Sequence, residues 1–372
     1  MTGPDLLTLF LCGDVMTGRG IDQVLPHPSD PRLFEPAVKD ARTYVELAEE
    51  AFGRIRAPVS FDYVWGEALE ELRRVDPHAR IVNLETAVTT SDDAWPGKGI
   101  HYRMHPENTP VLEAAGVDCC VLANNHVLDW GLAGLRETLD VLDAAGIGTV
   151  GAGRDADEAA EAWTLEVEGG PTIVVLAFGR ETSGVSSEWV AGPDRPGVRL
   201  LRDLSDESVG EVAEAVREAG SGEELVVVSI HWGPNWGYNV PRDQRRFARA
   251  LIDEAGADVV HGHSSHHPKG IEVHRGRPIL YGCGDFVNDY EGITGYERFR
   301  DDLVLMYFPT FDPGTGELAR FRMTPLRLRR FRLERPPEED VAWIRERMDR
   351  ECRKVGGGVS IGPDGGLELE WS

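Results

Sequence analysis

The sequence predicts an α/β protein in which strands and helices alternate and stack in layers. Three observations predict this fold class. Strand-like apolar runs alternate with helical patterns up to about residue 260, strands dominate after that point, and no repeat or low-complexity linker interrupts the chain. Alternation of this kind indicates a mostly parallel or mixed sheet covered by helices.

The first part of the chain opens with an expected strand at residues 6–13, because the apolar run LLTLFLC is short and ends in Gly-Asp. A helix is expected at 131–145, where apolar residues recur at spacings of three and four. The other elements expected here are strands at 79–84, 117–123 and 148–150 and helices at 41–54, 66–75, 110–115 and 155–162.

The second part adds hairpins around glycine turns, at 165–178 around Gly169-Gly170-Pro171 and at 271–281 around Gly276. After about residue 332 we expect a modest appendage built from a helix at 338–355 and a terminal hairpin. The remaining expected elements are strands at 224–230, 258–261, 303–309 and 317–328 and helices at 207–219 and 242–255.

The composition narrows the classes of partner. The formal net charge of −25 disfavours nucleic acid and anionic membranes, whose binding needs clustered Lys and Arg. No apolar run approaches the ~18–20 residues of a membrane helix, and residues 6–12 lack the flanks of a signal peptide. The five cysteines form no CxxC pair, which is typical of a reducing compartment. We therefore expect a cytoplasmic protein; its oligomeric state is open.

Five expected strands carry polar residues just past their carboxyl ends. In open α/β sheets the ligand crevice lies outside these ends, so we expect the five groups to meet. The segments are Gly13-Asp14, Asn83-Leu84-Glu85, Ala123-Asn124-Asn125-His126, His231-Trp232-Gly233 and His261-Gly262-His263-Ser264-Ser265-His266-His267.

The residue types of these segments suit a divalent metal, because carboxylate oxygens and imidazole nitrogens bind Zn, Mn or Fe. Each segment alone has a structural explanation: Asp14 can be a loop residue, Asn125 a helix N-cap and His231 a core histidine. The four histidines at 261–267 are the strongest signal, since so dense a cluster is typical of metal binding. A carboxylate such as Glu85 can bridge two ions that clamp the oxygens of a displacement.

Taken together and in this order, the motifs resemble the CapA family, which is named for poly-γ-glutamate capsule synthesis and is similar to the calcineurin-like metallophosphatases. The resemblance spans about residues 6–310. It implies a layered α/β/β/α sandwich, which we expect over residues 1–332, followed by the small α+β appendage that the pattern of elements predicts at 333–372. The motifs that carry it are GDVMTGR at 13–19, NLET at 83–86, ANNHVLDWG at 123–131, GAGRDADEA at 151–159, HWG at 231–233, GHSSHHPKGIEV at 262–273 and LYGCGDF at 280–286.

The resemblance also implies roles for individual residues. Asp14, Glu85 and His266 would hold a first ion, with Glu85 at the bridging position. The second ion would be held by Asn125, His231 and His263. One or two ions of Mn, Zn or Fe are the implied cofactors.

His126 would be the acid or base beside the ions, oriented by Asp129, because an imidazole near its pKa needs a partner that fixes its tautomer. Met16 stands where metallophosphatases have a histidine, which leaves the first site short of one ligand. Arg19 and Arg103 are candidate substrate-binding residues, since Arg forks suit carboxylate or phosphate; structural salt bridges are the alternative for both.

We expect a metal-dependent hydrolase that acts on an anionic or peptide-like substrate linked to poly-γ-glutamate or capsule metabolism. A first alternative is a metal-dependent epimerase of a ribosomally made peptide, with Cys12, Cys283 or His267 as second proton donor. A second alternative is a non-catalytic metal-binding component of a biosynthetic complex.

Overall fold

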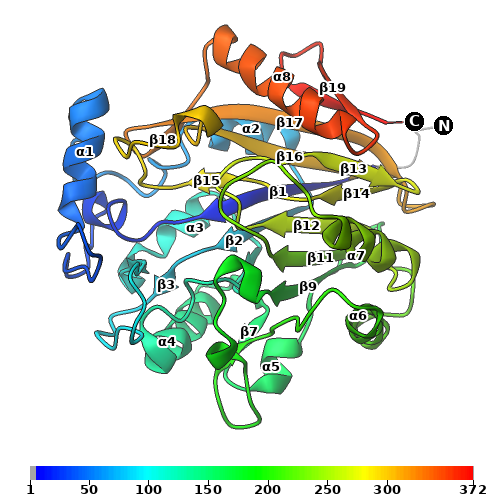
Figure 1. Ribbon diagram of the computed structural model, residues 1–372, viewed down its shortest axis with the longest axis horizontal. Helices are drawn as coiled ribbons and strands as arrows, with labels where there is room; N and C mark the ends of the chain where they lie inside the picture. Colours follow the sequence, from blue (N-terminus) through cyan, green and yellow to red (C-terminus); the bar gives the residue numbers. More distant parts are fainter. Residues whose placement is uncertain (1–5, 372) are drawn as a thin grey trace.

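The computed structural model describes residues 6–371, whose strands form two large sheets (Figure 1). The first sheet has ten strands in the order β19-β20-β17-β16-β1-β2-β5-β6, with β15 also beside β1 and β18 beside β17. Its strands are β1 (Leu7–Val15), β2 (Ala79–Leu84), β5 (Cys119–Val121), β6 (Gly148–Val150), β15 (Asp285–Val287), β16 (Leu303–Phe311), β17 (Leu318–Arg329), β18 (Arg332–Glu334), β19 (Gly358–Ile361) and β20 (Leu367–Glu370).

The second sheet has six strands in the order β13-β14-β12-β11-β9-β8. Its central strands β9, β11, β12 and β14 are parallel, and β8 and β13 are antiparallel edges. The strands are β8 (Trp163–Leu165), β9 (Ile173–Gly179), β11 (Leu225–His231), β12 (Val259–His263), β13 (Ile271–His274) and β14 (Arg277–Leu280). Two small ribbons pair β3 (Ala87–Val88) with β4 (Arg103–Met104) and β7 (Ala152–Gly153) with β10 (Gly197–Val198).

Three apolar cores define the layers. One lies between the two sheets and joins side chains such as Leu9 of β1 and Val227 of β11. A second lies on the outer face of the first sheet and includes Leu135 of α4, and a third covers the second sheet with Val212 of α6 and Phe247 of α7. The helices are α1 (Arg42–Phe52), α2 (Ala68–Val75), α3 (Pro110–Ala114), α4 (Gly131–Ala144), α5 (Ala156–Ala160), α6 (Asp206–Ala219), α7 (Arg242–Asp253) and α8 (Glu338–Arg353).

The expected α/β/β/α sandwich is therefore present. Strand β11 reads LVVVSIH with every residue buried, as expected for a strand covered on both faces. The glycine hairpin begins two residues earlier than predicted, at Trp163 rather than Leu165, because the turn around Gly169 and Gly170 is wider than a tight hairpin loop. Strand β15, at Asp285–Val287, is an element that the sequence pattern did not predict.

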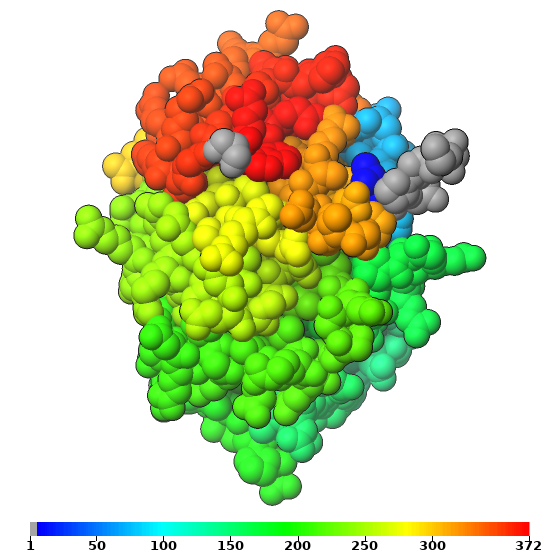
Figure 2. Space-filling model, turned by 90° about the vertical axis from the view of Figure 1, so that its right-hand side faces the viewer, coloured from blue at the N-terminus to red at the C-terminus, as the bar shows by residue number. Residues whose placement is uncertain are grey.

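The C-terminal segment is continuous with the main body. Ile344 and Met348 of α8 lie in the core between the sheets, and β20 pairs with β17 of the first sheet. In Figure 2 this segment, coloured orange-red to red, forms the upper end of the molecule and lies directly on the yellow surface below it. The boundary at residue 332 stays a prediction. Among residues 6–371 no helix is long and apolar enough to cross a membrane.

Candidate metal centre

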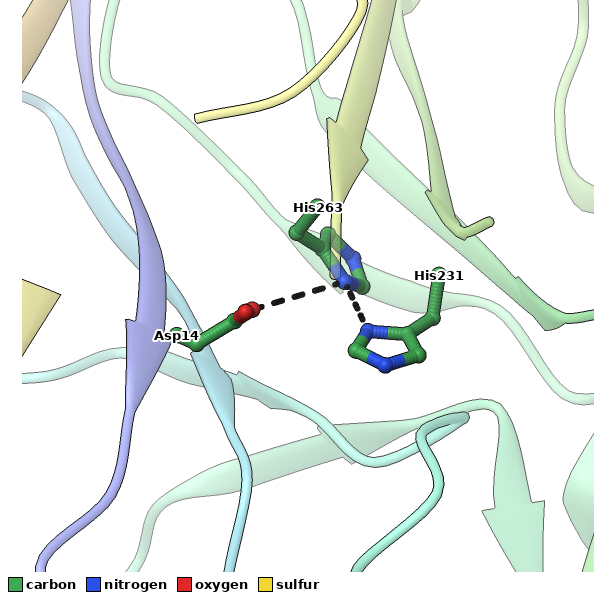
Figure 3. A group of neighbouring side chains, drawn as sticks. All are labelled: Asp14, His231 and His263. Carbon is green, nitrogen blue, oxygen red and sulfur yellow. Dashed lines mark hydrogen bonds and ion pairs between the residues drawn. The ribbon is translucent and has the colours of Figure 1, made fainter. Parts of the chain in front are cut away.

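The carboxyl ends of strands from both sheets meet at one place (Figure 1). Asp14 is the next-to-last residue of β1, and His231 and His263 are the last residues of β11 and β12. His231 and His263 are register partners in adjacent parallel strands, so their side chains leave the sheet together. Figure 3 shows Asp14 facing these two imidazoles across the gap between the sheets.

Two groups of buried side chains share Asp14 as a common member. The first group is Asp14, His231 and His263, and the second is Asp14, His266 and Asp285. In each group, every residue has one nitrogen or oxygen atom that could bind a metal, and these atoms lie within 4.8 Å of one another. Glu85 lies beside both groups, with its Oε1 3.9 Å from Nε2 of His231. The predicted ligands are thus brought together, and Asp14 occupies the position common to both groups.

The carboxylates of this cluster fit a cation. Oδ2 of Asp14 and Oε2 of Glu85 are buried and have no hydrogen-bond partner among the residues that the structure describes. Burial and the neighbouring Asp285 raise the pKa of Asp14, and burial with Asp14 raises the pKa of Glu85. Such crowding of like charges is costly unless a positive charge is present, so the donor set suits divalent ions.

A hydrogen-bond chain behind the cluster fixes the tautomer of His263. The carbonyl of Cys12 can only accept, so His261 donates from Nε2 at 2.8 Å. Nδ1 of His261 then accepts from the hydroxyl of Ser229 at 3.0 Å, and that oxygen accepts from Nε2 of His263 at 2.9 Å. The lone pair on Nδ1 of His263 therefore faces Asp14, with Nδ1 4.0 Å from Oδ1.

His231 presents a lone pair to the same point. Its Nε2 lies 2.7 Å from Oδ1 of Asn125 and donates to it, which leaves Nδ1 unprotonated. Nδ1 of His231 and Nδ1 of His263 are 2.7 Å apart. Two lone pairs repel at this distance unless a proton or a cation lies between them, which again suits a metal at this position.

Asp285 is not among the predicted ligands, yet the structure groups it with Asp14 and His266. It follows the motif Gly282-Cys283-Gly284 and is the parallel register partner of Asp14, and its Oδ1 is 2.8 Å from Nδ1 of His266. A Cβ atom on Gly13 would lie 1.6 Å from the carbonyl oxygen of Gly284, so Gly13 permits this close approach of the chains. The sequence signal was a second Gly-Asp pair after an apolar run.

His126 and Asp129 form a pair at the edge of the cluster. Nδ1 of His126 donates to Oδ2 of Asp129 at 2.7 Å, and Nε2 points toward Oε1 of Glu85 at 3.7 Å. Burial lowers the pKa of His126 to about 4 although Asp129 opposes this change. Lys98, which sequence reasoning missed, contacts Oδ1 of Asp129 at 2.7 Å and the carbonyl of Asn125 at 2.6 Å.

A cavity of about 530 Å³ opens onto these groups. Glu85, Asn125, His126 and His266 line its inner part. The imidazole of His266 lies 5.2 Å from the ring of Trp236, which forms part of the wall. The cavity therefore joins the candidate metal ligands, the His126–Asp129 pair and an aromatic wall.

The two candidate substrate arginines occupy different surroundings. Arg19 lines the cavity, but its guanidinium binds Asp289 at 2.5 Å and Glu35 at 2.9 Å. Arg103 is not among the lining residues and binds Asp92 at 2.9 Å. Both arginines thus form the salt bridges that were the alternative, and substrate binding by either stays a prediction.

The three groups named as second proton donors are enclosed. Cys12 and Cys283 are fully buried, and burial raises the pKa of both thiols. Nδ1 of His267 donates to the carbonyl of Pro268 at 3.1 Å, and Nε2 accepts from the backbone N–H of Gly237 at 2.9 Å. Both nitrogens of His267 are therefore engaged by backbone.

The fold and this cluster define a four-layer α/β protein with a candidate metal centre between its two sheets. The model of the family described as bacterial capsule synthesis protein PGA_cap matches residues 8–290, and the chain belongs to this family.

Two relatives are similar over most of their length. A probable polyglutamine synthesis accessory protein of Mycobacterium tuberculosis is 46% identical over 98% of this chain and 96% of its own. The PGA biosynthesis protein CapA of Bacillus subtilis is 31% identical over 87% of this chain and 72% of its own. A solved structure described as a novel phosphatase from Mycoplasma pneumoniae covers 90% of this chain and 96% of that chain, with TM-score 0.45 and 11% identity; a likeness of this size supports no functional conclusion.

Proposed function

We propose that the protein is a divalent-metal-dependent hydrolase that cleaves an amide bond of a peptide-like substrate in poly-γ-glutamate or capsule metabolism. The observation that carries the proposal is the pair of unpartnered, buried oxygens on Asp14 and Glu85 beside two imidazole lone pairs. The names of the relatives, which refer to polyglutamine synthesis and PGA biosynthesis, supply the substrate class.

The residues that would hold the ions are the six predicted ligands together with Asp285. A bound divalent ion supplies positive charge that polarises a carbonyl oxygen and favours ionisation of water. Mn, Zn and Fe all accept this mixture of oxygen and nitrogen ligands. The ligands are Asp14, Glu85, Asn125, His231, His263, His266 and Asp285.

His126 is the proposed proton carrier. Its Nδ1–H is held by Asp129, so the free lone pair on Nε2 is on the side of Glu85 and the cavity. A neutral imidazole in this position accepts a proton as the nucleophile attacks and returns it to the leaving amine. The ion pair between Lys98 and Asp129 keeps that carboxylate charged and in place.

The test is hydrolysis of γ-glutamyl-p-nitroanilide by protein loaded with Mn, Zn or Fe, with metal content measured by elemental analysis. His126→Gln is expected to lower turnover by about 10²- to 10⁴-fold while metal content is unchanged. His27→Gln is the matched control, because the side chain of His27 is 45% exposed and faces Glu107. Absence of turnover with all three metals, or full turnover by His126→Gln, would refute the proposal.

A further inference from the structure

The outer part of the cavity differs in chemistry from its inner part. Ile100, Ile293 and Tyr296 line it, and they are respectively 45%, 37% and 38% exposed. They are three of only seven large apolar side chains that are this exposed among the described residues. Apolar groups gathered at the mouth of one cavity, rather than scattered over the surface, are typical of a binding surface.

Two aromatic rings extend this apolar surface toward the candidate metal ligands. Trp236 stacks on Tyr296 with ring centroids 4.1 Å apart and planes 10° apart. The ring of Trp236 also neighbours that of His266, with the two ring centroids 5.2 Å apart. A continuous apolar wall therefore runs from the cavity mouth to the imidazole beside Asp285.

Among the residues that the structure describes, the cavity wall offers no unpaired lysine or arginine to a substrate. Its two basic lining residues are Arg19 and Lys98, and both are neutralised by carboxylates. Asp301 and Glu35 also line the cavity, and Glu35 pairs with Arg19. Within the described residues, a run of substrate carboxylates would thus meet apolar side chains at the cavity mouth, the carboxylate of Asp301 near His266, and no unpaired lysine or arginine.

We propose that the cavity recognises an uncharged, apolar or flat group on the amine side of the cleaved γ-glutamyl amide, which packs along Trp236, Tyr296 and Ile293. This inference rests on the proposed function and names its substrate class. The bond that is cleaved joins a γ-glutamyl unit to a neutral group. An internal bond between two glutamates is disfavoured, because the extra carboxylate has no cationic partner at the cavity mouth.

The experiment measures binding separately from turnover, by calorimetry on metal-loaded protein. The probes are γ-glutamyl-phenylalanine amide and γ-glutamyl-glutamate. Burial of the aromatic group predicts at least about tenfold tighter binding of the phenylalanine amide. Ile293→Ser and Tyr296→Ala are expected to reduce this preference. Ile361→Ser is the matched control, since Ile361 is 54% exposed on β19 and is not a cavity residue.

Equal affinities, tighter binding of γ-glutamyl-glutamate, binding of neither probe, or an unchanged preference in Ile293→Ser and Tyr296→Ala would overturn this inference. The preference without turnover of either amide would refute the hydrolase and support the apolar subsite. Turnover of both amides without any preference would support the hydrolase and overturn the subsite.

Discussion

Asp14 and Asp285 are register partners on the adjacent parallel strands β1 and β15, and both carboxylates are buried. Oδ1 of Asp285 is 2.8 Å from Nδ1 of His266, which Asp14 also approaches. Burial lowers the pKa of His266, but Asp285 together with Asp14 and Asp301 more than offsets this effect, so the pKa is raised. Asp285 is therefore grouped with Asp14 and His266, at the predicted site that Met16 leaves short of one ligand.

The first prediction concerns Asp285 as a ligand. Asp285→Asn keeps the shape of the side chain but removes its charge, so we expect metal affinity to fall by at least about tenfold. A titration in competition with a chelating dye measures this change. Asp194→Asn is the control, because Asp194 is exposed in a loop. Unchanged affinity in Asp285→Asn would remove this residue from the ligand set.

The second prediction concerns stability with and without metal. A divalent ion at a hundredfold excess over its Kd is expected to stabilise the wild-type protein by about 2.7 kcal/mol. We expect the ion to stabilise Asp14→Asn much less than the wild type. The metal-free variant should nevertheless melt at a higher temperature than the metal-free wild type, because the substitution removes the charge of one of three crowded carboxylates, those of Asp14, Glu85 and Asp285. Calorimetric melting with and without chelator tests both. A metal-free variant that melts below wild type would contradict the repulsion argument.

The third prediction concerns the chain that fixes the tautomer of His263. Ser229→Ala removes the acceptor for Nε2 of His263, so the ring is no longer held with its lone pair toward Asp14. Loss of such a supporting contact typically weakens metal binding by about 10- to 100-fold. Ser265→Ala is the matched control, since its hydroxyl donates only to the carbonyl of His267. Equal affinities of the two variants would show that the chain has no effect on binding.

The fourth prediction concerns pH. Burial lowers the pKa of His261 to about 4 and that of His267 to about 3, below the ordinary value near 6.5. Between these values each of these two histidines binds a proton more readily in the unfolded chain, so its contribution to the free energy of unfolding is fully retained above about pH 6.5 and falls as pH falls toward about 4. A tenfold difference in proton affinity between the two states corresponds to about 1.4 kcal/mol, which gives about 3 kcal/mol for His261 alone.

Urea unfolding in chelator at about pH 7.5 and about pH 5 is compared between the wild type and His267→Asn, because the raised pKa values of Asp14 and Glu85 oppose the histidine effect in both proteins alike. His267→Asn is expected to be less stable than wild type at the higher pH, because it loses contacts to Gly237 and Pro268, and to lose less stability on acidification. A His267→Asn variant that loses as much stability as the wild type on acidification would contradict the assignment of a neutral, buried His267.

The sequence predicted which strands carry polar groups at their carboxyl ends, since apolar runs such as LVVVSIH end visibly at His231. It did not predict β15, whose three residues are too few to show a periodic pattern and whose pairing with β1 depends on the close approach at Gly13. Lys98 was missed for a similar reason: it lies in an irregular loop and contacts Asp129 from far along the chain.

The sequence by itself determined the α/β class, the order of the motifs and the residue types that gather at the candidate metal centre. The reason is that apolar periodicity and the ends of strands can be recognised within short stretches of consecutive residues. Only the tertiary structure decided that Asp285 joins Asp14, that Arg19 and Arg103 are paired with acids, and that apolar side chains surround the cavity mouth. These relationships join residues far apart in the chain. They depend on how the two sheets pack, which local sequence patterns do not specify.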